Sequence, residues 1–221
     1  MKVDKSLSLS ESVHDYLLDM ILSMEMKPGE KISEEKIANI FGSSRAPIRD
    51  ALKRLENEGI INIYPRRFAE VAKYTDDLIK QIGVVRVFHD LMAIKLSLLY
   101  GSKADFLKMR TINEECLEAA KAEDTALRIK KDCEFHLEMG RITQNQQLIK
   151  FAEELYIRIE FIQSCRYTEL VNPQEQYRQH SMIIDLLIER NEKKVMEALA
   201  KHDSNFHGLS KEYPLDFFIS K

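Results

Sequence analysis

Apolar residues recur every three or four positions in three short segments of the first third of the chain. The first segment ends before Pro28-Gly29, and the second follows Ser33, a good helix N-cap. The third covers residues 45–58 and ends at Gly59, where a left-handed residue is expected. This spacing predicts three helices, of which the second is short and joined to the third by a turn at Gly42-Ser43.

Two short strand-like segments follow the third predicted helix. Ile60–Tyr64 and Phe68–Ala72 are rich in β-branched and aromatic residues, and they flank Pro65-Arg66-Arg67. Helix, short helix, turn, helix and hairpin, in this order, predict a winged helix-turn-helix. In that motif the second helix of the pair enters the major groove of DNA.

From Thr75 onward the pattern changes to long amphipathic helices without strand-like segments. The apolar stripes predict six helices, over residues 75–100, 103–122, 125–142, 146–166, 173–190 and 192–209. Asparagine or aspartate stands at the expected N-cap of the last four. We therefore expect a mainly α protein with two domains, an N-terminal winged helix-turn-helix of residues 1–74 and a C-terminal antiparallel all-α helical bundle of residues 75–221.

The third predicted helix carries a basic stripe opposite its apolar one. Arginine and lysine recur there at intervals of four residues. The arginine fork suits this place because it can bind guanine O6 and N7, or a phosphate, through two hydrogen bonds. A basic stripe alone is also typical of a solvated helix face. Further polar and basic residues at the turn and the hairpin tip favour DNA binding, by Ser43, Ser44, Arg45, Arg49, Lys53, Arg66 and Arg67.

The overall composition bears on the surroundings of the protein. The 221 residues carry a net charge of −3, so attraction to nucleic acid must come from a local patch. Three cysteines without a CxxC pair argue against a disulfide framework and favour a reducing, cytoplasmic compartment. The apolar runs are much shorter than the roughly 20 residues that a membrane helix needs, so we expect no membrane segment.

Polar residues interrupt the apolar stripes of three predicted bundle helices. Asp132 and His136 lie four residues apart on the apolar face of the helix over residues 125–142. His180 and His202 take apolar positions in the last two helices. We therefore expect three imidazoles and one carboxylate to project together into the bundle.

A divalent transition metal would offset the cost of burying these polar groups. Imidazole nitrogens with one carboxylate oxygen suit zinc or nickel, and also manganese, iron or cobalt, better than calcium or magnesium. Each residue alone has a plainer interpretation, as a hydrogen-bonded core histidine or as an i,i+4 pair between Asp132 and His136. The four together favour a metal site.

The segment PGEKISEEKIANIFGSSRAPIRDALKRLENEGIINIYPRR resembles the DNA-binding domain of the GntR family of bacterial transcription regulators. The resemblance covers about residues 9–72 and implies DNA contacts by Ser44, Arg45 and Arg49 on the recognition helix and by Arg67 in the wing. The family usually has glycine after that wing arginine, whereas Phe68 stands here. We therefore expect this wing to read groove width less strongly.

The pattern Asp132-x3-His136, His180 and His202 is similar to the metal-binding set of the FCD domain, the C-terminal domain of FadR-type GntR regulators. The segment VVRVFHD adds to the resemblance, since that domain usually has an arginine followed four residues later by an acid, here Arg86 and Asp90. The resemblance implies that Arg86 binds the carboxylate of an organic-acid effector. An internal ion pair with Asp90 is the alternative. Further candidates to contact the effector are His89 and Arg158.

These features predict a metabolite-responsive transcription regulator and not an enzyme. The resemblance implies a homodimer that reads a palindromic operator in double-stranded DNA and responds to a small organic acid bound at the metal site. Two alternatives stay open. One is a metalloenzyme that acts on a small organic acid in the helical domain, and the other is a DNA-binding protein whose metal only stiffens the bundle.

Overall fold

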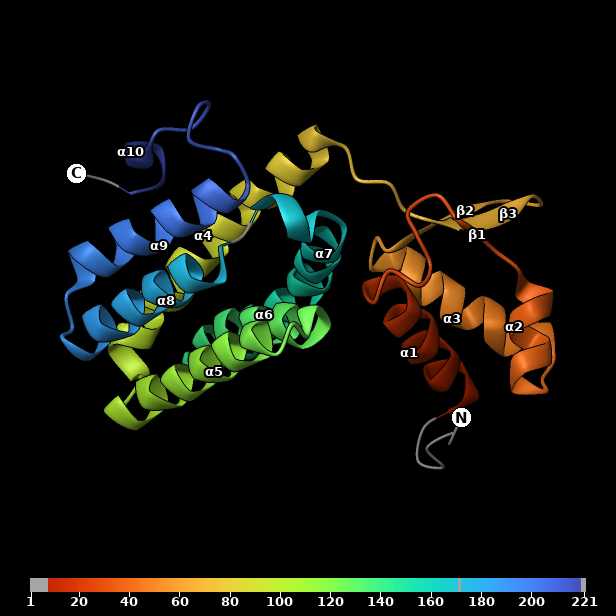
Figure 1. Ribbon diagram of the computed structural model, residues 1–221, viewed down its shortest axis with the longest axis horizontal. Helices are drawn as coiled ribbons and strands as arrows, with labels where there is room; N and C mark the ends of the chain where they lie inside the picture. The colour runs from red at the N-terminus through yellow and green to blue at the C-terminus, as the bar shows by residue number, and fades with distance from the viewer. Residues whose placement is uncertain (1–7, 171, 220–221) are drawn as a thin grey trace. The chain divides into compact units, whose positions relative to one another are not determined.

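A computed structural model describes residues 8–170 and 172–219 of the chain (Figure 1). The chain forms two compact units, which adjoin in the sequence between Tyr74 and Thr75. The ends of the two expected domains, residues 1–7 and 220–221, lie outside the described residues. The predicted fold class is confirmed, because the first unit is a winged helix-turn-helix and the second is a helical bundle.

Three helices form the body of the N-terminal unit: α1 Leu9–Leu22, α2 Glu34–Phe41 and α3 Arg45–Asn57. As predicted, Ser33 caps α2 by accepting a hydrogen bond from a backbone N–H of its first turn, and Gly59 follows α3 with a φ of 80°. The apolar stripes of α1 and α3 pack against each other to form the core of the unit. The opposite, basic face of α3 therefore stays exposed.

A small antiparallel sheet completes this unit, with the strand order β1-β3-β2. The predicted hairpin is present as β2 Ile61–Tyr64 and β3 Phe68–Val71. The strand β1, Lys31–Ile32, was not predicted, because two extended residues are too few to show alternation. Lys31 pairs with Glu70 of β3, so β1 ties the segment before α2 to the hairpin.

The second unit contains the six predicted helices, and the bounds in the described part of the chain are α4 Asp76–Tyr100, α5 Lys103–Lys121, α6 Thr125–Ile142, α7 Gln146–Leu170, α8 Pro173–Ile188 and α9 Glu192–Phe206. Helix α7 runs past its predicted end at Arg166, where the backbone leaves helical geometry with a φ of −122°. A short helix α10, Leu215–Phe218, was not predicted, since one turn shows no periodicity. Among the described residues, every helix is too short or too polar to span a bilayer.

Helix α4 positions the polar interior of the bundle. It packs against α6, α7 and α9, and its buried side carries Arg86, His89 and Asp90. Gly83 permits the close approach of α9, because a Cβ at this position would lie only 2.5 Å from the Cβ of His207. The predicted metal ligands of α6 and α9 therefore face the charged residues of α4.

Candidate functional site

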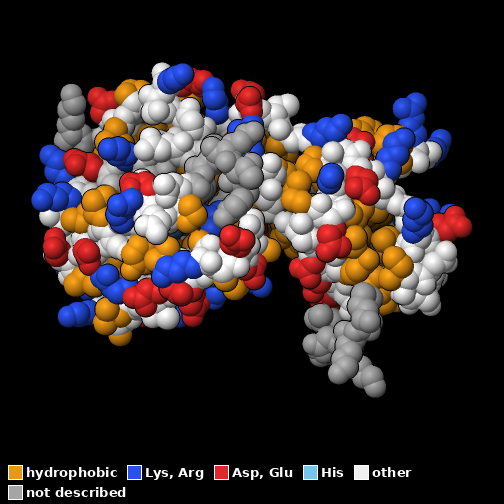
Figure 2. Space-filling model, viewed as in Figure 1, with side chains coloured by type: hydrophobic (Ala, Val, Ile, Leu, Met, Phe, Trp, Pro, Cys, Tyr) orange, Lys and Arg blue, Asp and Glu red, His pale blue; other side chains and the backbone are white. Residues whose placement is uncertain are grey.

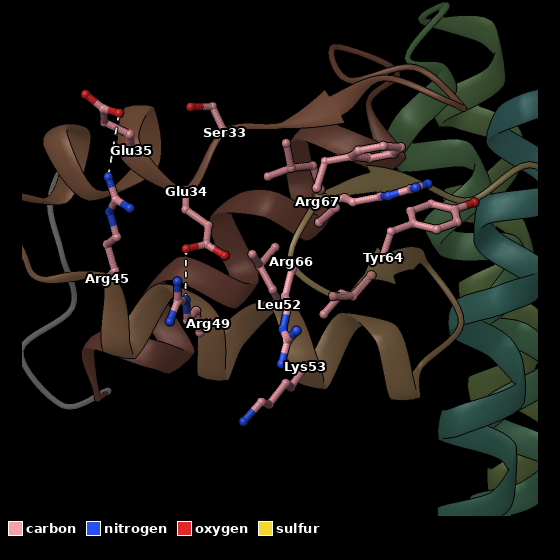
Figure 3. A pocket seen from close by; sticks show the side chains of 14 residues that line it. Ser33, Glu34, Glu35, Arg45, Arg49, Leu52, Lys53, Tyr64, Arg66 and Arg67 are labelled. Atoms are coloured by element: carbon pink, nitrogen blue, oxygen red, sulfur yellow. Dashed lines mark hydrogen bonds and ion pairs between the residues drawn. The ribbon is translucent and has the colours of Figure 1, made fainter.

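A groove of about 640 Å³ on the N-terminal unit is bounded by α2, α3 and the hairpin (Figure 3). The basic residues that the sequence predicts at the DNA line it, namely Arg45, Arg49, Lys53, Arg66 and Arg67. In Figure 2, Lys and Arg side chains gather on the N-terminal unit over the hairpin and beside α2. A local positive surface is therefore present on a chain whose net charge is negative.

Two acidic residues at the start of α2 contact two of the arginines of α3, Arg45 and Arg49. Arg49 donates from Nε to Oε2 of Glu34 at 3.0 Å, and Nη2 of Arg45 lies 3.7 Å from Oε2 of Glu35 (Figure 3). Both arginine side chains are still 60% exposed. The Arg49 bond uses Nε and not the terminal Nη edge with which arginine reads guanine, so it orients this side chain without blocking its reading edge.

The N-terminus of α3 is open to an anion. Ser44 is the N-cap residue, but its hydroxyl makes no capping hydrogen bond to the described first turn of the helix. Ser43 donates its hydroxyl to the carbonyl of Ser44 at 3.2 Å. Backbone N–H groups at such a terminus attract phosphate oxygens. The sequence predicts phosphate contacts for these two serines, which lie at this terminus.

The hairpin tip carries two arginines that point in different directions. Arg66 adopts a φ of 59°, and its side chain points toward Lys53 of α3, whereas Arg67 points away beside Tyr64 (Figure 3). Phe68, which stands where the family usually has glycine, packs on Tyr64 with ring centroids 4.8 Å apart. The tip is therefore braced by an aromatic cross-strand pair.

The structure brings His136, His180 and His202 together inside the bundle. They come from α6, α8 and α9, and their ring centroids lie between 4.7 and 5.5 Å apart. Burial is the main cause that lowers the pKa values of His180 and His202 well below the usual value, and nearby imidazoles and Arg86 lower them further. Both rings are therefore neutral near pH 7, which is the form that binds a metal.

Each of the three imidazoles is oriented through its Nδ1 atom. The partners of these Nδ1 atoms are Oδ2 of Asp90 for His136 at 3.0 Å, Oδ1 of Asn113 for His180 at 3.2 Å and Oε1 of Gln179 for His202 at 2.7 Å. Oxygen acceptors at Nδ1 leave the lone pairs on the Nε2 atoms. The Nε2 atoms of His180 and His202 lie only 3.2 Å apart, an arrangement that a cation between them would stabilise. The donor set therefore fits a transition metal.

Asp132, the fourth predicted ligand, lies beside the cluster. Its Oδ1 is 3.6 Å from Nε2 of His180, while the side-chain amides of Gln163 and Gln176 donate to its two oxygens. Arg128 donates in turn to the carbonyl oxygens of both glutamines. The carboxylate is thus held beside the three-histidine cluster, near His180, by amides that the sequence pattern did not indicate.

Arg86 reaches the same cluster from α4. Its Nη2 is 2.9 Å from Nε2 of His136 and 3.3 Å from Oδ1 of Asp203, and its Nε donates to the hydroxyl of Tyr156 at 3.2 Å. Burial alone would lower the pKa of Arg86, but Tyr156, Asp203 and Asp90 hold it well above its usual value. A permanent positive charge therefore lies against one of the metal-facing nitrogens.

The expected i,i+4 pair of Arg86 and Asp90 is long, with 3.7 Å between Nε and Oδ2. Asp90 instead accepts from Nδ1 of His136, from Nδ1 of His89 at 2.8 Å and from the Tyr156 hydroxyl. Burial raises the pKa of Asp90, but the hydrogen bonds from His136 and His89 outweigh it and hold this pKa well below the usual value. Asp90 is therefore an ionised acceptor that fixes the His136 ring.

The other two residues predicted to contact the effector, His89 and Arg158, do not reach the three-histidine cluster in the way that Arg86 does. Nε2 of His89 is 3.3 Å from the Leu148 carbonyl oxygen, so both of its nitrogens have partners outside the three-histidine cluster. Arg158 is half-buried on α7, and it is Tyr156 of that helix that contacts Arg86. Tyr156 gave no signal in the sequence because its role depends on the packing of α7 against α4.

Comparison with known proteins connects each unit to a described family. The model for "Bacterial regulatory proteins, gntR family" matches residues 9–71, and that for the "FCD domain" matches residues 82–205. The uncharacterized HTH-type transcriptional regulator YdhC of Bacillus subtilis is 26% identical, with 91% of this chain and 90% of that protein covered. The Nta operon transcriptional regulator of Aminobacter aminovorans is 27% identical, with 78% and 80% covered.

The solved structure of E. coli McbR/YncC shares the fold, with a TM-score of 0.75, 21% identity and coverage of 93% of this chain and 99% of that one. A winged helix-turn-helix followed by an FCD domain defines a class of DNA-binding transcription regulators. The chain belongs to the GntR family, in its FadR-like group with a C-terminal FCD domain. Both relatives are named as transcription regulators, which argues against the metalloenzyme alternative.

We expect the histidine cluster to bind zinc in one-to-one stoichiometry. Replacing a residue that only orients a metal ligand typically weakens metal binding about 10- to 100-fold. His202→Gln removes a candidate ligand itself and should therefore weaken zinc binding by more than that. Calorimetry and elemental analysis after dialysis measure both quantities. The control His14→Gln removes a buried imidazole from the other unit and should bind zinc like the unchanged protein. Equal zinc affinity for both variants would contradict the assignment.

Proposed function

We propose that this GntR regulator senses a small organic acid at a metal held in its FCD domain. Three histidines and Asp132 hold the cation, with zinc or nickel as the best match to this donor set. Arg86 binds the carboxylate of the acid, and the N-terminal unit reads the operator. The observation that carries the proposal is the buried guanidinium of Arg86, 2.9 Å from a ring nitrogen that faces the cluster.

On the DNA side, the proposal assigns base reading to Arg45 and Arg49 and phosphate contacts to Ser43, Ser44, Lys53, Arg66 and Arg67. It is supported by the exposed positions of the two arginines on α3 and by the open helix N-terminus beside them. Phosphate contacts supply affinity that depends on salt, whereas contacts with base edges supply specificity.

On the effector side, the proposal uses the competition for Nε2 of His136. A nitrogen lone pair can accept a hydrogen bond from Arg86 or coordinate a metal, but not both. If the three histidines held a metal, Nε2 of His136 would no longer accept from Arg86, and Nη2 of Arg86 would be available to bind a carboxylate. The acid changes DNA affinity only if it binds more tightly to one arrangement of the protein than to another.

A homodimer is supported by an exposed apolar stripe on α4. Leu78, Val85, Met92 and Leu99 follow one another at intervals of seven residues, and they are 37% to 72% exposed. Apolar residues at this interval are typical of helices that pair with another helix. An antiparallel pair of α4 helices around a two-fold axis would place acidic residues at the start of one helix opposite Lys95 of the other. Two recognition helices would then read a palindromic site.

The double substitution Arg45→Ala with Arg49→Ala should abolish sequence-specific DNA binding and leave the fold intact. Each two-point contact between arginine and a base contributes about 1–3 kcal/mol of discrimination, so the loss from two contacts should exceed about 30-fold. Fluorescence anisotropy measures it on duplexes selected from a random pool with the unchanged protein. Arg110→Ala on α5 is the control. Specific binding by the double variant at normal affinity would refute the assignment.

Acid binding to the zinc-loaded protein should change its affinity for the selected duplex, and Arg86→Lys should weaken the response. Lysine keeps the buried charge but lacks the planar fork, so we expect about a tenfold higher acid concentration for half-response. Arg110→Lys makes the same change at a half-exposed ion pair with Asp185 and should respond normally. If a broad acid panel leaves DNA affinity unchanged while zinc is bound, the metal is structural and the proposal fails.

If α4 forms the dimer interface, Met92→Glu should weaken dimerisation at least about tenfold, because an ionised glutamate would be buried without a partner in an apolar interface. Sedimentation equilibrium measures the dissociation constant. Met182 on α8 has similar exposure, 48% against 55% for Met92, so Met182→Glu is a matched control that should leave the dimer intact. Dissociation by the control and not by Met92→Glu would place the interface elsewhere.

A further inference from the structure

One face of α9 carries buried polar residues that the metal site does not use. Asp203, Ser204 and His207 follow the ligand His202 in the sequence, and all three are at most 5% exposed. Asp203 lies beside Arg86 of α4, and the His207 ring packs against Gly83 of the same helix. These residues therefore extend the polar interior from the histidine cluster along the contact between α9 and α4.

The polar atoms on this face lack aligned hydrogen bonds within the described part of the chain. Among the described residues, no group donates a hydrogen bond to either oxygen of Asp203, and the Ser204 hydroxyl also makes no hydrogen bond. Nη2 of Arg86 is 3.3 Å from Oδ1 of Asp203 and supplies charge, but it does not form an aligned hydrogen bond. Both ring nitrogens of His207 also lack an aligned hydrogen bond, although the backbone of Ile79 interacts with the ring. Buried carboxylates in folded proteins normally accept several hydrogen bonds, so donors are missing here.

A second cation does not explain the unpaired carboxylate. One oxygen of Asp203 lies within 4.8 Å of ligand atoms of Asp90 and His136, which is a metal-like grouping. However, Asp90 is already saturated by His89, His136 and Tyr156, and the guanidinium of Arg86 already supplies the positive charge. The unmet requirement of Asp203 is for hydrogen-bond donors, not for another charge.

We propose that Asp203 accepts a hydrogen bond from the effector. The site would then select acids that carry a hydroxyl or amino group on the carbon next to the carboxylate. The inference rests on the proposed function, in which Arg86 and the metal bind that carboxylate. Because Nη2 of Arg86 contacts both His136 and Asp203, a carboxylate bound there brings its neighbouring carbon next to Asp203. The unpaired Ser204 hydroxyl is the adjoining partner for a further polar group on the acid.

Asp203 contributes to selectivity in two ways. Its carboxylate attracts a hydroxyl or an ammonium group, and it repels an acid that brings a second negative charge without a donor. A site built around a buried hydrogen-bonding group discriminates strongly against an analogue that leaves the group unpaired. The residue therefore sets which acids bind and is not required for holding the metal.

Two matched series of acids test this inference on the zinc-loaded, full-length protein. Malate, aspartate and succinate differ only in the group on one carbon, and so do lactate, alanine and propionate. We expect the acid with a donor to bind about 10- to 100-fold more tightly than the acid without one in calorimetry. The comparison of malate with aspartate distinguishes a hydroxyl from an ammonium group as the preferred donor.

Asp203→Asn is the deciding variant, because 2-hydroxy acids chelate a metal better whether or not Asp203 is present. The variant should reduce the preference for the donor to less than about threefold and should bind succinate at least as tightly as the unchanged protein does. Its zinc affinity and melting temperature establish that it is folded and loaded. Asp185→Asn on α8, an exposed residue paired with Arg110, is the matched control and should keep the full preference.

Three results would count against the inference. A preference that survives in Asp203→Asn would overturn it, since chelation alone would then explain the selectivity. Equal weakening of malate and succinate binding in that variant would also overturn it, because Asp203 would then serve only as the counter-ion of Arg86. If none of the six acids binds the zinc-loaded protein, the proposed effector class fails, and this inference fails with it.

Discussion

The bond between Nη2 of Arg86 and Nε2 of His136 is the contact on which the interior of the bundle depends. The guanidinium is buried among Asp90, Asp203 and Tyr156, and it supplies the positive charge that these groups require. It uses the same ring nitrogen that faces His180 and His202. The guanidinium of Arg86 and a metal would therefore need the same lone pair of His136, so only one of them can use it at a time.

Under the proposed function, this competition would give the FCD domain two arrangements, one with Arg86 bound to His136 and one with a metal there, and a regulator needs such a pair of states. A ligand shifts an equilibrium only by the difference in its affinity for the two states. In our account, Arg86 would bind His136 when the histidines hold no metal and would bind the acid when they hold one, so both ligands would act through one residue. DNA affinity would change if this rearrangement favoured one conformation of the N-terminal unit over another. In that unit, Arg45 and Arg49 form ion pairs with acidic residues of α2.

The sequence predicts the helices of the bundle well because their apolar stripes and N-caps are local signals. It also predicts that His136, His180 and His202 face inward, since helical spacing alone fixes the face of a residue. It does not predict which polar side chains from other helices meet them. Gln163, Gln176 and Tyr156 support the cluster only through the packing of α7 and α8, and β1 and α10 are too short to show a period.

The most direct test of the central claim is the affinity of an acid that binds the protein, measured by calorimetry with and without one equivalent of zinc. If zinc releases Arg86 from His136, the acid should bind the zinc-loaded protein at least about tenfold more tightly, and by linkage the acid should tighten zinc binding by the same factor. Equal acid affinity in the two states would contradict the account, because the metal and the arginine would then act independently.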